Sequence, residues 1–178
     1  DKRYGGTDGD DCWSVLECDD GNFILAGDSR SGIGGDKTQD SRGGKDFWVL
    51  KIDQDGNKLW DKRFGGNHDD QCRSVIRTAD GNYLLCGQSH SSISGDKTED
   101  TKGEFDYWVI KIDDNGNKLW DKSLGSPERD FLHDSITRSD GGFFLLGTSN
   151  SEIVGGDKTA YGSGGWLVSL NSSGSGKQ

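Results

Sequence analysis

The sequence contains no methionine, a single proline and no apolar run of about 20 residues, the length that spans a bilayer as a helix. Hydrophobic residues make up only 29% of the 178 residues, and no segment shows the periodicity of an amphipathic helix. The absence of methionine leads us to expect a processed form or an excised segment. The net charge of −10 repels phosphate and anionic lipid, so we expect no nucleic-acid partner and no membrane insertion.

Glycine and aromatic residues are abundant: 29 Gly, six Trp, seven Phe and four Tyr. This glycine content predicts many tight turns, and a few large rings can bury enough apolar area to form a core. Two of the four cysteines, Cys12 and Cys18, lie on one predicted strand, roughly 20 Å apart if extended, which is too far for a disulfide. We interpret Cys12, Cys18, Cys72 and Cys86 as small buried residues, with disulfides as the alternative, and their spacing does not predict zinc.

The chain contains three copies of one unit. "GDKTQD" at residues 35–40 returns as "GDKTED" at 95–100 and as "GDKTAY" at 156–161. "DFWVLKIDQDGNKLW" from Asp46 recurs as "DYWVIKIDDNGNKLW" from Asp106, and the third copy is shortened to "GWLVSLNSSGSGKQ" from Gly165. Alternating apolar positions and Asp-Gly turns predict four short antiparallel strands, A to D, in each unit. The predicted fold class is therefore all-β.

Four-stranded antiparallel units in tandem are typical of a β-propeller, with a threefold β-trefoil as the alternative. We expect a single repeat domain over residues 1–178, with blades at about 8–64, 68–124 and 128–178. Residues 1–4 align with the end of strand D, so they are expected to complete the last blade, from the same chain or from another copy. Three blades are too few to close a ring, so we expect a homodimer of six blades, or else a segment of a longer array.

The segment "GDKTEDTKGEFDYWVIKIDDNGNKLWDKSLGS" resembles a tandem repeat found in large secreted and surface proteins of Bacteroidetes-type bacteria. The likeness covers essentially the whole chain. It implies a β-propeller that is secreted or displayed at the cell surface, and it brings no catalytic residues with it. The third copy departs from the pattern, with Ser169 where the other copies have Lys51 and Lys111.

Two long polar loops of each unit, between strands D and A and between strands B and C, emerge on one face of a propeller, where binding usually occurs. The candidate ligand-face residues are Asp10, Asp70, Asp130, Asp36, Lys37, Thr38, Asp96, Lys97, Thr98, Asp157, Lys158 and Thr159. Carboxylates in irregular loops suit Ca²⁺, the one cofactor considered, at Asp10, Asp70 and Asp130. The alternative, favoured by repetition in every copy, is that each aspartate caps its own loop. The three lysines are expected to form exposed ion pairs with a neighbouring loop, or to hold an anion.

The tryptophans of strands C and D are expected to dock neighbouring blades. "KIDQDGNKLW" is similar to the blade turn of quinoprotein propellers and to the Asp-box of sialidases, in which a tryptophan packs between blades. The residues assigned to this role are Trp48, Trp60, Trp108, Trp120 and Trp166.

The sequence predicts a noncatalytic extracellular binding or adhesion module that holds a glycan or protein on its loop-rich face. One alternative is a structural spacer of a surface filament, and a second is a hydrolase or lyase acting on polysaccharide. No catalytic residue is assigned, because His68, His90 and His133 fall in unrelated columns of the repeat without a nucleophile motif. Trp13 could stack on a glycan, although a core position is the favoured interpretation.

Overall fold

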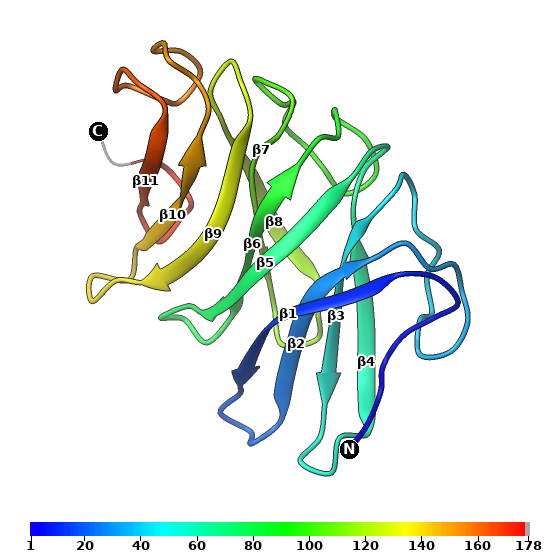
Figure 1. Cartoon of the computed structure of the whole chain (residues 1–178). Helices are drawn as coiled ribbons and strands as arrows, with labels where there is room; N and C mark the ends of the chain where they lie inside the picture. Colours follow the sequence, from blue (N-terminus) through cyan, green and yellow to red (C-terminus); the bar gives the residue numbers. More distant parts are fainter. Residues whose placement is uncertain (177–178) are drawn as a thin grey trace.

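The computed structural model describes residues 1–176, which form antiparallel strands and no helix, so none that could cross a membrane (Figure 1). The strands are β1 (Asp10–Glu17), β2 (Phe23–Ser29), β3 (Asp46–Ile52), β4 (Lys58–Phe64), β5 (Asp70–Arg77), β6 (Tyr83–Ser89), β7 (Asp106–Ile112), β8 (Lys118–Leu124), β9 (Asp130–Thr137), β10 (Phe143–Ser149) and β11 (Gly164–Leu170). The all-β prediction is confirmed.

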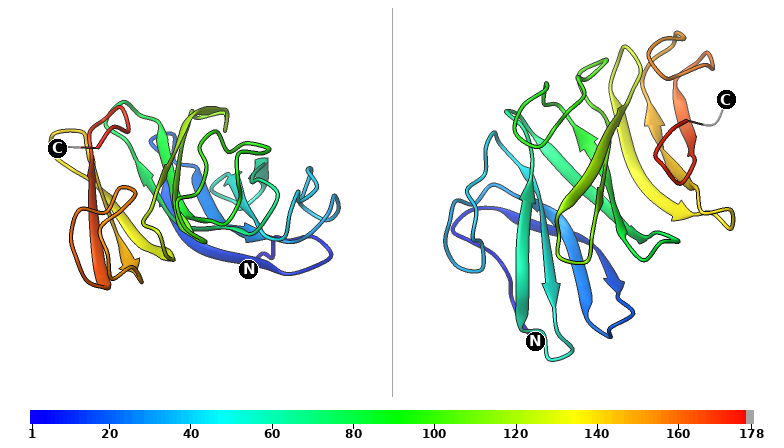
Figure 2. Two further views of the ribbon diagram at one scale, coloured as in Figure 1. Left: turned by 90° about the horizontal axis from the view of Figure 1, so that it is seen from above. Right: turned by 180° about the vertical axis from the view of Figure 1, so that it is seen from behind.

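The strands form three separate antiparallel sheets, ordered β1-β2-β3-β4, β5-β6-β7-β8 and β9-β10-β11, which we call blades 1, 2 and 3. Each blade is a meander in which consecutive strands pair, and the blades follow one another side by side (Figure 2). No closed barrel occurs in residues 1–176, which argues against the β-trefoil alternative. Successive meander sheets are consistent with the blades of a β-propeller.

The predicted Asp-Gly turns join strands A and B in every blade. Gly21, Gly81 and Gly141 have φ of +76°, +81° and +80°, a region in which a side chain would be strained. In the first of these turns, Asp20 Oδ1 accepts a hydrogen bond from the Asn22 amide at 3.0 Å. The turns therefore form for a local reason, which explains why they could be identified from the sequence.

The core lies between the blades. Phe47 of blade 1 packs on Trp108 of blade 2, with ring centroids 5.0 Å apart, and Tyr107 of blade 2 packs on Trp166 of blade 3 at 4.9 Å. A Cβ on Gly87 would lie only 2.8 Å from the Phe47 ring, so glycine is required for this close approach. Aromatic side chains thus supply the apolar area that the low hydrophobic content left in question.

All four cysteines are free. Cys18, Cys72 and Cys86 are buried, whereas Cys12 is exposed on β1. Burial raises the pKa of the Cys86 thiol to about 12. The interpretation as small buried residues therefore holds for three of the four.

Residues 1–6 lie against blade 1 (Figure 1). Lys2 Nζ donates to Asn57 Oδ1 at 2.7 Å, and the Tyr4 hydroxyl donates to the Gly56 carbonyl at 2.7 Å. Blade 3 consists of three strands, with β11 at its edge. The segment that aligns with the end of strand D therefore contacts blade 1 and does not complete blade 3 of the same chain.

Candidate functional site

The aspartates at the start of each first strand tie two loops together. Asp10 Oδ2 accepts hydrogen bonds from the Gly6 amide at 2.7 Å and the Ser31 hydroxyl at 3.1 Å. Asp70 repeats this pattern with the Gly66 amide and Ser91, and Asp130 accepts from the amide and hydroxyl of Ser126. In each blade the D–A loop is held by a carboxylate that accepts N–H and O–H donors, which is the capping alternative.

These contacts bear on the calcium hypothesis. Ca²⁺ needs six to eight oxygen ligands, whereas the oxygens of Asp10, Asp70 and Asp130 face hydrogen-bond donors. Within residues 1–176 no group of three or more metal-ligating side chains is gathered at one point. Burial also raises the pKa of Asp70, an environment that disfavours a charged carboxylate. The geometry therefore assigns these residues to the loops and gives no support for a cation.

The aspartate of each GDKT motif binds the glycine-containing segment that precedes the first strand of its blade. The Asp36 amide donates to the Gly5 carbonyl at 3.0 Å, while the Gly5 amide donates to Asp36 Oδ2 at 3.1 Å. Asp96 forms the same reciprocal pair with Gly65, and Asp157 forms it with Gly125. This aspartate therefore connects blade 2 to blade 1 and blade 3 to blade 2, and in blade 1 it binds the N-terminal segment.

The threonine of the motif binds strand D of its own blade in blades 1 and 2. The Thr38 amide donates to Asp61 Oδ2 at 2.9 Å, and the Thr98 amide donates to Asp121 Oδ2 at 3.0 Å. Asp61 also accepts from Trp48 Nε1 at 3.2 Å. The B–C loop is thus fastened to strand D by a single buried carboxylate. Thr159 occupies the corresponding position in blade 3, where residues 1–176 include no strand D.

The lysines of the motif are buried, contrary to the exposed ion pairs that the sequence led us to expect. Lys37 Nζ donates to the Ser31 carbonyl at 2.6 Å and to Ser41 Oγ at 2.7 Å. Lys158 donates to two loop carbonyls in the same way, and Lys97 donates to the Glu99 carbonyl and Ser123 Oγ. Burial lowers the pKa of Lys37 and of Lys97. Each ammonium holds its loop closed and is not available to an external anion.

The tryptophans lie between blades. A Cβ on Gly116, in the C–D turn of blade 2, would lie 3.2 Å from the Trp60 ring, and one on Gly174 in blade 3 would lie 2.8 Å from the Trp120 ring. Trp108 and Trp166 pack against the preceding blade, as described above. Trp48 occupies the equivalent position in blade 1, where no preceding blade is present in the described chain.

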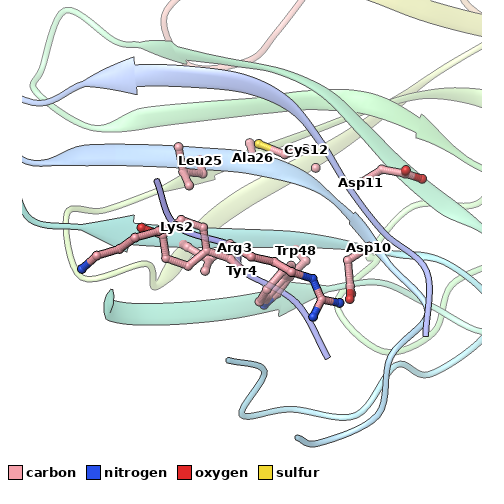
Figure 3. Close-up of a pocket in the computed structure, with 11 residues that line it drawn as sticks. Lys2, Arg3, Tyr4, Asp10, Asp11, Cys12, Leu25, Ala26 and Trp48 are labelled. Atoms are coloured by element: carbon pink, nitrogen blue, oxygen red, sulfur yellow. The ribbon is translucent and has the colours of Figure 1, made fainter. Parts of the chain in front are cut away.

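The face of blade 1 that carries Trp48 is covered in part by residues 2–4 and by no other blade of the described chain, and we call it the front face. A pocket of about 450 Å³ lies there, with an apolar floor that includes Cys12, Leu25 and Trp48 (Figure 3). Residues Lys2 to Tyr4 form part of its rim. In blades 2 and 3 the same side of the sheet is covered by the preceding blade, so the front face corresponds to a surface that is buried between blades elsewhere in the chain.

The opposite end of the chain exposes a second apolar surface, the back face of blade 3. It consists of Ile136, Phe144, Leu146 and Leu167, which line one shallow pocket. Leu146 is 49% exposed and Leu167 is 56% exposed. The corresponding side of blades 1 and 2 is buried against the next blade. The front face and the back face therefore both correspond to surfaces that are buried between blades elsewhere in the described chain.

A different cluster lies where the first strands of the three blades meet. β1 contacts β5, and β5 contacts β9, so the first strands of the three blades lie next to one another, along what we call the inner edge of the chain (Figure 1). Each has one bulge, at Trp13, at Arg73 and at His133, where the register with the second strand shifts. A bulge redirects a side chain away from its usual position on the sheet. The repeat thus brings three chemically different side chains to one structural position.

The three bulge residues line a common pocket of about 390 Å³. We call it the bulge pocket, and it is lined by Trp13, Arg73, Gln88, Phe131, Leu132 and His133. The Arg73 guanidinium carbon lies 4.4 Å above the centroid of the Trp13 ring, a cation–π contact. Trp13 is itself held by a hydrogen bond from its Nε1 to Asp28 Oδ1 at 2.9 Å.

Sequence reasoning considered Trp13 and His133 separately and did not single out Arg73. The signal was present, because residues 13, 73 and 133 are separated by sixty positions, the period of the first two repeats. In the first two copies the neighbouring positions match, as Cys-x-Ser-Val, whereas this position changes from Trp to Arg, and it is His in the third copy, whose neighbours also differ. Only the bulge and the packing of the first strands reveal that the three side chains share a pocket.

Comparisons with known proteins leave the family open. No family model matches the chain. It is 24% identical over 144 residues to the regulatory protein FlaEY of Caulobacter vibrioides, an alignment that covers 76% of this chain and 15% of that protein. A protein of unknown function from Bacteroides caccae, solved by crystallography, aligns at 13% identity over 96% of this chain and 67% of its own, with a TM-score of 0.35.

Proposed function

We propose that this chain is a noncatalytic binding module whose protein ligand is a second copy of itself, docked blade to blade. The observation that carries this proposal is that the front face of blade 1 and the back face of blade 3 are the two halves of an interface formed twice inside the chain. The loop residues first considered for binding are engaged in internal hydrogen bonds. The sheet faces are therefore the better candidates.

The back face is apolar like the interfaces between blades, but its large and small side chains occupy different positions. Blade 1 presents Ala26 and Phe47 to blade 2, and the aligned residues of blade 3 are Leu146 and Gly165. One position gains volume and the other loses it, as in a repacked core that preserves total volume. Contiguous apolar surface of this kind on a soluble domain marks an interaction site.

Polar groups at the same end support a second copy as the partner. In blades 1 and 2, Asp61 and Asp121 accept hydrogen bonds from the tryptophan of strand C and the threonine of GDKT. Among the described residues no carboxylate serves Trp166 Nε1 or the Thr159 amide in this way. The residue aligned with this column is Asp1. Blade-to-blade docking would place Asp1 of the second copy beside them.

The position of residues 1–6 supports the proposed docking. They contact blade 1 as residues 61–66 contact blade 2, through the Gly5–Asp36 and Gly65–Asp96 pairs. A second copy whose blade 3 packs on this front face would receive residues 1–4 along the open edge of β11. Two copies joined twice in this way would give a closed ring of six blades, whereas contacts that do not close would give a filament.

Sedimentation velocity tests this assembly. We expect the wild-type chain to sediment at twice its mass of 19.3 kDa, and Leu167→Lys to sediment as a monomer because it places a charge in the docked back face. Leu119→Lys is the matched control, since Leu119 is 50% exposed on β8 outside both open faces. A monomeric wild-type chain would overturn the proposal, and a polydisperse distribution would favour the filament. The secreted or surface location stays a prediction.

A further inference from the structure

We propose that the bulge pocket binds a sugar that carries a carboxylate, such as a hexuronic acid. This inference does not depend on the assembly proposed above, because the pocket lies at the inner edge rather than on the front or back face. Its volume of about 390 Å³ falls within the range of roughly 300–1,000 Å³ typical of small-molecule sites.

Arg73 supplies the charge that selects the ligand. In the part of the chain that the structure describes, no carboxylate forms an ion pair with Arg73, although the chain carries a net charge of −10. The guanidinium is held from two sides, by the Trp13 ring below it and by Gln71 Oε1, which accepts from Nη2 at 2.7 Å. A guanidinium fixed in orientation presents its remaining N–H donors to a carboxylate as a fork.

Gln88 supplies an unfilled acceptor. Its side chain is 2% exposed, and its Nε2 donates to Gln71 Oε1 at 2.9 Å. Its Oε1 has no hydrogen-bond partner among the described residues. A buried polar atom left in this state is costly, so a donor supplied by a ligand would stabilise the site. A sugar hydroxyl is such a donor, and a deprotonated carboxylate such as acetate has none.

The rest of the lining suits the body of a sugar ring. His133 is exposed and its Nε2 lies 3.3 Å from Thr148 Oγ1, which places a second polar group within the pocket wall. Phe131 contributes an aromatic surface against which the C–H groups of a pyranose can pack. Asp28, which holds Trp13, is neutralised by Lys45 at 2.6 Å, so it does not cancel the charge of Arg73.

These contacts distinguish between ligand classes. A neutral sugar would satisfy Gln88 and leave Arg73 unpaired, while a small carboxylate would pair with Arg73 and leave Gln88 unsatisfied. Nucleic acid is disfavoured, because a single arginine cannot offset the repulsion between phosphates and an acidic surface. A hexuronic acid satisfies both groups with one ring.

Titration by two-dimensional NMR of the full chain tests the assignment, with the Trp13 indole N–H as the reporter, assigned through its absence in Trp13→Phe. The probes are glucuronate and galacturonate, their neutral counterparts glucose and galactose, and acetate. We expect both uronates to bind at least about tenfold more tightly than the neutral sugars and than acetate, since each comparison removes one charge-assisted or buried hydrogen bond.

Two variants make the result specific. Arg73→Gln is expected to lose at least about tenfold in uronate affinity. Arg138→Gln is the matched control, because Arg138 also stacks on a ring, 4.8 Å above Phe144, but lies outside the pocket, and it should bind as the wild type does. Urea denaturation checks that both variants fold. Uronate binding equal to that of glucose or of acetate, unchanged binding by Arg73→Gln, or no saturable shift at millimolar probe would each overturn the proposal.

Discussion

A buried aspartate at the start of β3 provides a sharp test of the electrostatics. Asp46 is fully buried, and its Oδ2 accepts the Arg42 amide at 2.7 Å, while Oδ1 has no partner among the described residues. Burial raises the pKa of Asp46 from 3.8 to about 7; Asp70 raises it further, while Arg63 and Lys37 oppose the rise. The informative change is Asp46→Asn, which keeps the shape and an acceptor but cannot ionise.

The sign of the effect follows from proton binding. Between about pH 4 and pH 7 the folded chain retains a proton on Asp46 that the unfolded chain has released, so the free energy of unfolding falls as the pH rises through this window. A shift from 3.8 to about 7 at about 1.4 kcal/mol per pH unit amounts to a loss on the order of 4 kcal/mol above pH 7. Asp46→Asn escapes this loss. We expect it to match the wild type at pH 3.5 and to be more stable at pH 8, by up to that amount.

Urea denaturation, followed by tryptophan fluorescence at several pH values, measures the difference. Asp61→Asn is the control of opposite sign. Burial alone would raise the pKa of Asp61, but hydrogen bonds from Lys58, the Thr38 amide and Trp48 outweigh it, and the pKa is lowered. Asp61→Asn should therefore be less stable than the wild type at pH 8. A stability difference between Asp46→Asn and wild type that stays constant from pH 3.5 to pH 8 would refute the reasoning.

Two further predictions concern packing. In urea denaturation, Trp108→Ala should lower the free energy of unfolding by roughly 3–5 kcal/mol, because it leaves a cavity in the buried interface of blades 1 and 2. Tyr161→Ala is the control: Tyr161 is 83% exposed, so its loss should change the free energy of unfolding by less than about 0.5 kcal/mol. Equal effects of the two substitutions would contradict an interblade core. In Leu167→Lys, the variant expected to be monomeric, a thiol reagent should label only Cys12 before unfolding, and the three buried cysteines should react on unfolding. Rapid labelling of more than one thiol would show that the blades separate readily.

Much of the fold could be predicted from local signals. The Asp-Gly turns require glycine at positive φ, and strand alternation follows from the geometry of a β-strand, so both are written in short stretches of sequence. The three units could be identified from the sixty-residue recurrence, because each copy repeats the same turn and strand residues. Conversely, the burial of Lys37 was missed. An ammonium in a polar loop looks solvated until the loop closes over it and its carbonyls face inward.

The sequence by itself determined the strands, their turns and their order, since these depend on neighbours within a few residues. Only the tertiary structure decided which side chains meet. Asp36 joins its blade to Gly5 across 31 positions, and Trp13, Arg73 and His133 converge because three bulges lie at one level where the first strands pack together. The physical reason is that contacts between blades depend on how the sheets stack. The residue pattern within one strand contains no information about that stacking.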